Sequence, residues 1–124
     1  MDFDGCASAQ GGLRPGLVFQ NNVGNNYSPN IIALPLTSQM KKCNQPTHVL
    51  VRANDTGLIY DSMVLCENPE RMPKEKVGAY ITTLSDEYME RVAEASLLAT
   101  SAISFIDLDK LITLWHKANN LNAA

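Results

Sequence analysis

Four apolar runs of strand length, each bounded by turn-forming residues, restrict the fold of this chain more than any other feature. They span residues 16–20, 31–36, 47–52 and 62–66. Runs this short, rich in Val, Ile and Leu, favour strands over helices, which need ten or more residues. The segments between them are rich in Gly, Pro, Asn and Asp, the residues that favour turns. The sequence therefore predicts a small sheet of short strands.

Two helical patterns follow toward the C-terminus. Ser85 is predicted to cap a helix of about 14 residues whose first turn carries Asp86 and Glu87, favourably placed beside the helix N-terminus. Its apolar face consists of Tyr88, Met89, Val92, Ala95 and Ala99. Asp107 is predicted to cap a second helix, with an apolar stripe of Leu108, Leu111, Ile112, Trp115 and Ala118. We expect the second stripe to pack against the core; the alternatives are that it covers a sheet edge or binds a partner.

The size and charge of the chain limit its function. Its 124 residues and 13.6 kDa are typical of one domain. The net charge is −3, but residues 1–60 have four basic and three acidic side chains, whereas residues 61–124 have six basic and ten acidic. A stoichiometric nucleic-acid binder is expected to be basic overall, whereas an enzyme acting on RNA needs only a local basic groove. The charge distribution is compatible with an enzyme that acts on RNA through a local basic groove.

The sequence contains no motif for a metal or a cofactor. It lacks a phosphate-binding glycine motif, a metal-spaced His/Glu set and a Ser/His/Asp pattern, so we expect neither group. Cys6, Cys43 and Cys66 lack metal-ligand spacing, and their odd number predicts free thiols. No uninterrupted apolar stretch reaches membrane-spanning length, and the first residues do not resemble a signal peptide. We therefore expect a cytoplasmic protein without a membrane partner.

Arg14 and Thr37 are the two residues best suited to phosphate chemistry. Arg14 follows Gly-Gly-Leu and precedes Pro15, which restrains it to extended backbone at the start of the first apolar run. Thr37 ends the second run. Arginine binds phosphate through a planar fork of donors and stays protonated, and a threonine hydroxyl both donates and accepts hydrogen bonds. Taken singly, a surface ion pair for Arg14 and a satisfied strand-end hydroxyl for Thr37 are the commoner roles.

Six motifs occur along the chain in a fixed order. They are Gly-Gly-Leu-Arg-Pro, Leu-Val-Phe-Gln-Asn-Asn, Asn-Asn-Tyr-Ser-Pro, Pro-Leu-Thr-Ser, Gln-Pro-Thr-His-Val and Asp-Ser-Met-Val-Leu. From about Ser8 to Ile106 the chain thereby resembles the MazF/PemK endoribonuclease toxins of bacterial toxin–antitoxin pairs. The resemblance implies a mainly β fold with C-terminal helices, namely a small SH3-like antiparallel barrel of the CcdB/MazF type whose first strand is truncated. We expect residues 1–106 to form the toxin domain and residues 107–124 a helical extension of it.

The resemblance also implies an activity. Toxins of this family cleave single-stranded mRNA at selected sequences without a metal, through attack of the 2′-hydroxyl, and leave a 2′,3′-cyclic phosphate. Arg14 and Thr37 match the catalytic pair. The expected partners are a second copy of the chain, forming a homodimer, and an antitoxin with a disordered acidic C-terminal segment. The alternative is a non-catalytic protein of the same fold that binds an antitoxin or poisons DNA gyrase.

Five further residues are candidates for binding the RNA. Ser8 and Gln10 match positions of the family's substrate loop, where Ala9 replaces a carboxylate. Lys41 and Lys42 are the densest positive charge in the chain, although a solvated loop is the commoner role for such lysines. Asn68 offers an amide where the family has glutamine.

We assign no catalytic role to His48 or to Arg71. His48 is a possible base because its pKa is ordinarily near neutral, but its position within a predicted strand favours a structural role. The family has an extended strand at the run from Glu67 to Pro73, but the two prolines of this run are predicted to prevent a central strand there. Arg71 is displaced by one place from the family's arginine, so we assign it no role.

Overall fold

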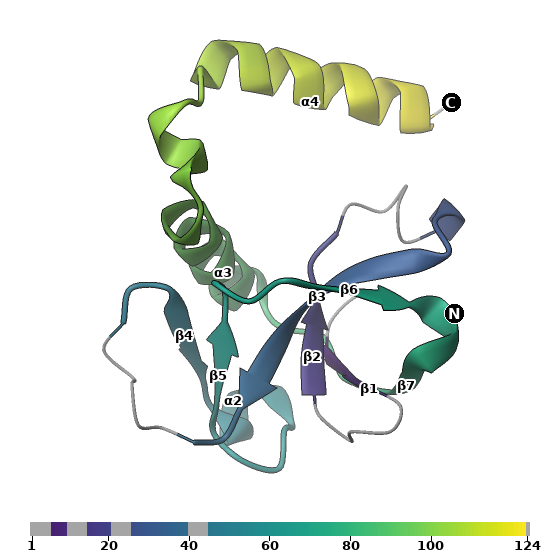
Figure 1. The fold of residues 1–124 in the computed structure, drawn as a ribbon, viewed down its shortest axis with the longest axis vertical. Coiled ribbons are helices and arrows are strands. Elements are labelled where there is room, and N and C mark those ends of the chain that lie inside the picture. The colour runs from purple at the N-terminus through teal and green to yellow at the C-terminus, as the bar shows by residue number, and fades with distance from the viewer. Residues whose placement is uncertain (1–5, 10–14, 21–25, 40–44, 124) are drawn as a thin grey trace.

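The computed structural model describes residues 6–9, 15–20, 26–39 and 45–123 and shows a curved sheet followed by helices (Figure 1). The strands are β1 Cys6–Ala9, β2 Pro15–Val18, β3 Asn30–Thr37, β4 His48–Val51, β5 Ser62–Leu65, β6 Glu70–Pro73 and β7 Val77–Thr82. The helices are α2 Ala53–Thr56, α3 Asp86–Ala99 and α4 Leu108–Ala123, with 3₁₀ turns η1 Lys74–Lys76 and η2 Ser101–Ser104. The predicted class, mainly β with C-terminal helices, is confirmed.

The longest strand, β3, is hydrogen-bonded along both edges. The strand order is β4-β5-β3-β2-β1-β7, with β6 also paired to β3, and every described pairing is antiparallel. One edge of β3 pairs with β2, and the other pairs first with β6 and then with β5. Among the described strands, β4 and β7 end the order without pairing with each other, so hydrogen bonds do not close this sheet into the expected barrel.

Alternation along the strands divides the buried side chains into two clusters. The larger cluster lies between the sheet and α3 and contains Leu17, Leu34, Leu36, Val49, Val51, Leu58, Val64, Cys66, Leu84, Val92 and Ala95. The smaller cluster contains Val18, Ile31 and Ala33, with Met72 and Val77 packed against it. Neighbouring residues of β2 therefore point into different clusters, which fixes the register of the sheet.

Helix α3 begins and packs as its sequence predicts. The Ser85 hydroxyl accepts a hydrogen bond from the Tyr88 backbone N–H at 3.3 Å, and the helix has 14 residues. Val92 and Ala95 are buried against the sheet, next to β4. The Tyr88 hydroxyl donates to Asp55 Oδ2 at 2.8 Å and accepts from the Arg52 N–H at 3.3 Å, so it also ties α3 to the α2 segment.

Two short strands form where the sequence did not predict a strand. Residues 7–9 belong to β1, which lies between β2 and β7, and so are not a loop. Their residues are small and have no turn chemistry, and the unpaired edges of both neighbours favour a strand there. Residues 70–73 form β6 against β3 despite the two prolines. Pro69 precedes this strand and Pro73 ends it, and β3 is its one described partner, so neither proline interrupts a central ladder.

Helix α4 does not pack into the core as predicted. Asp107 Oδ1 accepts from the Lys110 N–H at 3.1 Å, which confirms the predicted cap. All side chains of α4 that the structure describes are exposed, including its apolar stripe. Helix α4 lies apart from both buried clusters because the turn η2 and the residues after it lead the chain off the end of α3 (Figure 1). In the described part of the chain, no helix has the length and apolar character needed to span a bilayer.

The central position of β3 predicts a large effect of truncating its buried leucine. Leu34 is 1% exposed and Leu98, on the outer side of α3, is 58% exposed. We expect Leu34→Ala to lower the free energy of unfolding by about 3 kcal/mol, because it removes buried contacts and leaves a cavity. Leu98→Ala, the matched control, should change it by less than about 0.5 kcal/mol. Urea denaturation measures both, and equal effects would contradict the described core.

Candidate functional site

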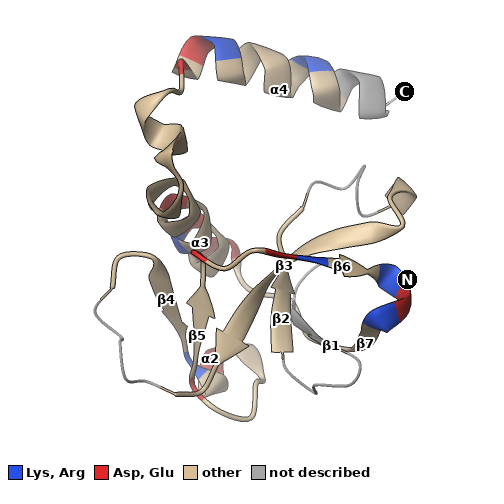
Figure 2. Cartoon of the chain, in the orientation of Figure 1, with Lys and Arg blue, Asp and Glu red and all other residues tan. Residues whose placement is uncertain are grey.

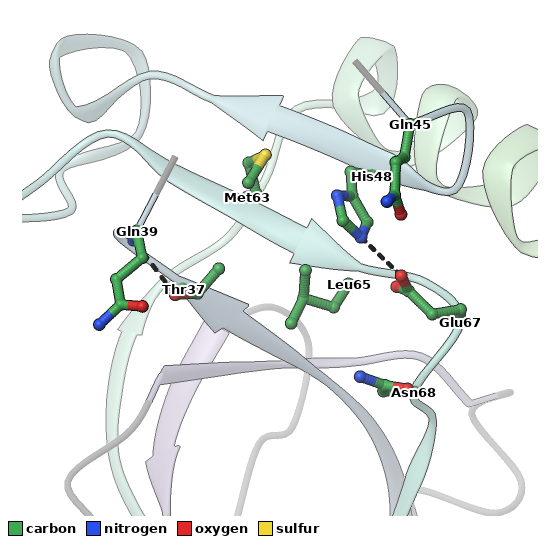
Figure 3. Close-up of a pocket in the computed structure, with 8 residues that line it drawn as sticks. All are labelled: Thr37, Gln39, Gln45, His48, Met63, Leu65, Glu67 and Asn68. Carbon is green, nitrogen blue, oxygen red and sulfur yellow. Dashed lines mark hydrogen bonds and ion pairs between the residues drawn. The ribbon is translucent and has the colours of Figure 1, made fainter. Parts of the chain in front are cut away.

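An open pocket of about 400 Å³ lies where β3 ends, on the side of the sheet opposite α3 (Figure 3). Its lining residues are Thr37, Gln39, Gln45, His48, Met63, Leu65, Glu67 and Asn68. Thr37 and Met63 alternate along their strands with Leu36 and Val64, which belong to the cluster beneath α3. The alternation that buries the core therefore turns the pocket residues toward the other face.

Thr37 is held in place by a local turn. It is the last residue of β3, lies opposite Met63 of β5 and is half-buried. Its hydroxyl oxygen accepts a hydrogen bond from the Gln39 N–H at 3.1 Å. This side-chain turn is typical of a threonine at the end of a strand. The bond uses one acceptor site, and a hydroxyl also has the capacity to donate.

His48 and Glu67 form a pair on the far wall of the pocket. His48 Nε2 lies 2.5 Å from Glu67 Oε2, and the histidine side chain is 6% exposed while the glutamate side chain is 32% exposed. The Thr47 hydroxyl donates to the same carboxylate oxygen at 3.4 Å. The carboxylate thereby fixes the orientation of the imidazole ring. Sequence reasoning did not assign Glu67 to the site; pairing the His48 strand with the Leu65 strand, as the structure does, was the signal needed.

Asn68 reaches the same pocket from the turn that follows β5. Its backbone N–H donates to the Leu65 carbonyl at 3.2 Å, which closes the turn before β6. Its side chain points toward the pocket from the side opposite His48 (Figure 3). Thr37 and Asn68, selected separately from the sequence, are thus brought into one pocket.

The remaining candidate residues are described only in part or not at all. Arg14, Gln10, Lys41 and Lys42 lie outside the described residues. The backbone of Ser8 belongs to β1 and pairs with that of Pro15, the first residue of β2, but its side chain is not described.

The strands around the pocket are uncharged. Strands β2, β3, β4 and β5 contain no Lys, Arg, Asp or Glu (Figure 2). The pocket lining therefore offers a hydroxyl, three side-chain amides and the His48–Glu67 pair, all of which can hydrogen-bond to a polar ligand. The segments 10–14 and 40–44, which adjoin β2 and β3 in the sequence, contain three of the chain's basic residues, namely Arg14, Lys41 and Lys42.

Cys66, directly beside Glu67, is not part of this chemistry. Its thiol is free and buried in the cluster beneath α3, as predicted for the one cysteine side chain that the structure describes. Burial raises the pKa of the Cys66 thiol, and the neighbouring Glu67 carboxylate adds to the effect. A thiol with a raised pKa is a poor nucleophile at neutral pH, so its role is packing.

Comparison with protein families gives a match over most of the chain. Residues 1–100 match the family described as the PemK-like, MazF-like toxin of type II toxin–antitoxin systems. The chain is 41% identical over 98 residues to the endoribonuclease EndoA of Bacillus subtilis (strain 168), covering 79% of this chain and 84% of EndoA.

Solved structures show the same fold. The Mycobacterium tuberculosis toxin MazF-mt6 superposes with a TM-score of 0.69 at 28% identity, covering 77% of this chain and 94% of that toxin. A mycobacterial endoribonuclease solved with its cognate antitoxin gives a TM-score of 0.69 at 24% identity, covering 80% of this chain and 94% of that one. The matched family region ends before α4, which begins at Leu108.

Proposed function

The chain belongs to the PemK-like, MazF-like toxin family of type II toxin–antitoxin systems, and we propose that it is a sequence-selective, metal-independent endoribonuclease that cuts single-stranded mRNA. The observation that carries the proposal is the open pocket at the end of β3 in which Thr37 and Asn68 meet, in a fold that a solved MazF toxin shares. The 41% identity with an endoribonuclease supports the reaction class.

The register of the sheet supports Arg14 and Thr37 as the catalytic pair. Gly16 pairs with Pro35 in the antiparallel β2–β3 ladder. Because this ladder is antiparallel, the start of β2 at Pro15 lies beside the end of β3 at Thr37, and Arg14 directly precedes Pro15 in the sequence. Ser8, paired with Pro15, belongs to the same end of the sheet. The proposed phosphate-binding and hydroxyl groups therefore come from strand ends that lie next to one another.

In the proposed reaction the RNA supplies its own nucleophile. The 2′-hydroxyl oxygen attacks the adjacent phosphorus, its proton is lost, and the bond from phosphorus to the 5′-oxygen breaks as that oxygen takes up a proton. The products are a 2′,3′-cyclic phosphate and a 5′-hydroxyl. Arg14 binds the phosphate through two donors and stabilises the charge that develops on it. Thr37 orients the 2′-hydroxyl or hydrogen-bonds the phosphate.

The His48–Glu67 pair is assigned to the neighbouring nucleotide in this proposal. Thr37 pairs with Met63, and Met63 pairs with Leu50, so His48 lies two strands across and two residues along from Thr37. Ideal strand spacings put the two Cα atoms about 12 Å apart. At that separation, and with His48 Nε2 paired to Glu67 Oε2, we assign the two side chains to neighbouring groups of the RNA. Asn68 lines the same part of the pocket and is proposed to hydrogen-bond the RNA there.

The charged contacts are proposed to come from the segments that adjoin β2 and β3 in the sequence. Lys41 and Lys42 follow the Thr37 turn in sequence and are proposed to bind phosphates next to the cut. Ser8 and Gln10 are proposed to contact the RNA on the Arg14 side. The few basic residues make a small footprint in one copy, and two-fold symmetry in a homodimer would double it.

A cognate antitoxin is the proposed inhibitor. A mycobacterial endoribonuclease and a Deinococcus radiodurans MazF, both similar in fold, were each solved with an antitoxin, described as cognate and as MazE respectively. We propose that a disordered acidic segment of such a partner folds along the groove and competes with RNA for its basic residues. The site of action is the cytoplasm, where mRNA and antitoxin are both present.

The first test of the proposal is RNA cleavage in the presence of EDTA. Because Arg14 and Thr37 need no metal, purified protein should still cut long single-stranded RNA in EDTA. The cuts should fall at a repeated short sequence, and attack of the 2′-hydroxyl should leave 2′,3′-cyclic phosphate ends. Adding the acidic antitoxin segment should stop the reaction. Intact RNA, combined with inhibition of DNA gyrase, would instead identify a non-catalytic protein of the same fold.

The second test separates the two catalytic roles. Arg14→Ala should lower the cleavage rate by about a hundredfold or more, since it removes charge stabilisation from the transition state. Arg14→Lys should rescue it poorly because a point charge lacks the planar fork. Thr37→Val should impair cleavage, and Thr37→Ser should retain part of it.

Two matched variants control for general effects of these changes. Arg91→Ala removes an exposed arginine on α3 that pairs with Glu87, and Thr113→Val removes a hydroxyl from α4. Both should cleave at the parental rate. Near-parental rates for both Arg14→Ala and Thr37→Val, in proteins shown to be folded by circular dichroism, would reject the assigned pair.

A further inference from the structure

Helix α4 presents an apolar face that no described part of the chain covers. Leu108, Leu111, Ile112, Leu114 and Trp115 are between 47% and 66% exposed, and Phe105 just before the helix is 85% exposed. A soluble monomer rarely exposes so many large apolar side chains in one place. The helix also forms by its own local signals, since Asp107 caps it and the Thr113 hydroxyl donates to the Asp109 carbonyl at 2.9 Å. A preformed helix with a bare apolar face is suited to bind another helix.

The spacing of this face fits a helix pair. Leu108, Leu111, Trp115 and Ala118 follow one another at intervals of three, four and three residues, which is the repeat that lines the contact between two packed helices. Sixteen residues give a helix about 24 Å long, enough for four such layers. In an antiparallel pair Leu111 would face the partner's Trp115 and Leu108 would face the partner's Ala118, so that large residues meet smaller ones.

The charges of α4 favour a copy of itself over an acidic partner. Residues 107–119 contain two acidic and two basic side chains, so the helix has no basic face to attract an acidic segment. The N-terminal end contains Asp107, Asp109 and Lys110, with a net charge of −1, whereas the C-terminal half contains Lys117, with a charge of +1. Antiparallel pairing brings the acidic end of one helix beside the basic half of the other, whereas parallel pairing brings like charges together. The helix dipoles also favour antiparallel packing, because the positive end of each helix then lies beside the negative end of the other.

We infer that α4 is an interaction surface for a second copy of this chain, and that the two α4 helices pack antiparallel about a two-fold axis near Thr113. In this arrangement Ile112 and Leu114 lie on either side of the contact, each close to its own counterpart in the partner. The pairing is independent of RNA cleavage, and it involves a segment beyond the matched family residues 1–100. It would thus add a contact specific to this chain to any assembly that the toxin domain forms.

The single tryptophan of the chain, Trp115, reports on this contact directly. With the full chain, its fluorescence should be blue-shifted at high protein concentration, where the ring is buried between helices, and should shift to the red on dilution. Ile112→Lys and Ile112→Glu each place like charges face to face across the axis. Each variant alone should therefore emit at the red position and associate about tenfold or more weakly.

Mixing the two variants tests whether the partner is a second copy of the chain and whether the two helices are antiparallel. An equimolar mixture pairs a positive with a negative residue across the axis, so it should recover the blue-shifted emission. The same two substitutions at Ile59, an 86% exposed residue away from α4, are the matched control and should leave the emission at the parental position. The inference would be overturned if Trp115 of the unmodified chain emitted at the red position at every concentration. It would also be overturned if the emission shifted to the blue only when an acidic antitoxin segment was added. Blue emission unaffected by the Ile112 variants, or variants whose mixture behaves as they do singly, would overturn it as well.

Discussion

The hydrogen bonding of β3 along both edges is the constraint on which the rest of this structure depends. With β2 on one side and β6 and β5 on the other, its register is fixed for its whole length. Because side chains alternate, a fixed register sends Leu34 and Leu36 into the core beneath α3 and turns Thr37 to the opposite face. A shift by one residue would exchange these faces, so the packing that stabilises the sheet also positions the proposed catalytic hydroxyl.

The strands that form the pocket supply hydrogen-bonding groups but no charged side chains. Its described walls come from strands without charged residues, apart from the His48–Glu67 pair at their end. Neutral walls suit ribose and base contacts, and we propose that phosphate is bound by Arg14, Lys41 and Lys42, which belong to segments next to β2 and β3 in the sequence. A net charge of −3 is compatible with an enzyme that acts on a nucleic acid, because a local basic site needs only a few basic residues.

Local sequence signals predicted the elements, and tertiary pairing decided where those predictions were wrong. The Ser85 and Asp107 caps and the apolar runs of β3, β4 and β5 depend on neighbouring residues, and the structure confirms them. Residues 7–9 form a strand because β2 and β7 need a partner there, which nothing in three small residues reveals. The place of Glu67 beside His48 likewise depends on the pairing of β4 with β5. The stripe of α4 was found from its spacing, but spacing could not tell a core contact from an exposed one.

The most direct test of the RNA site is hydrogen exchange of the full chain with a bound RNA that lacks the 2′-hydroxyl at the cleaved position. Such an RNA keeps its bases and phosphates but lacks the attacking hydroxyl, so it cannot react. The account predicts slower exchange of the backbone amides at residues 37–39 and 65–68, and unchanged exchange in α4. Tight RNA binding without protection of those two segments would contradict the assignment of the pocket at the end of β3 as the site of cleavage.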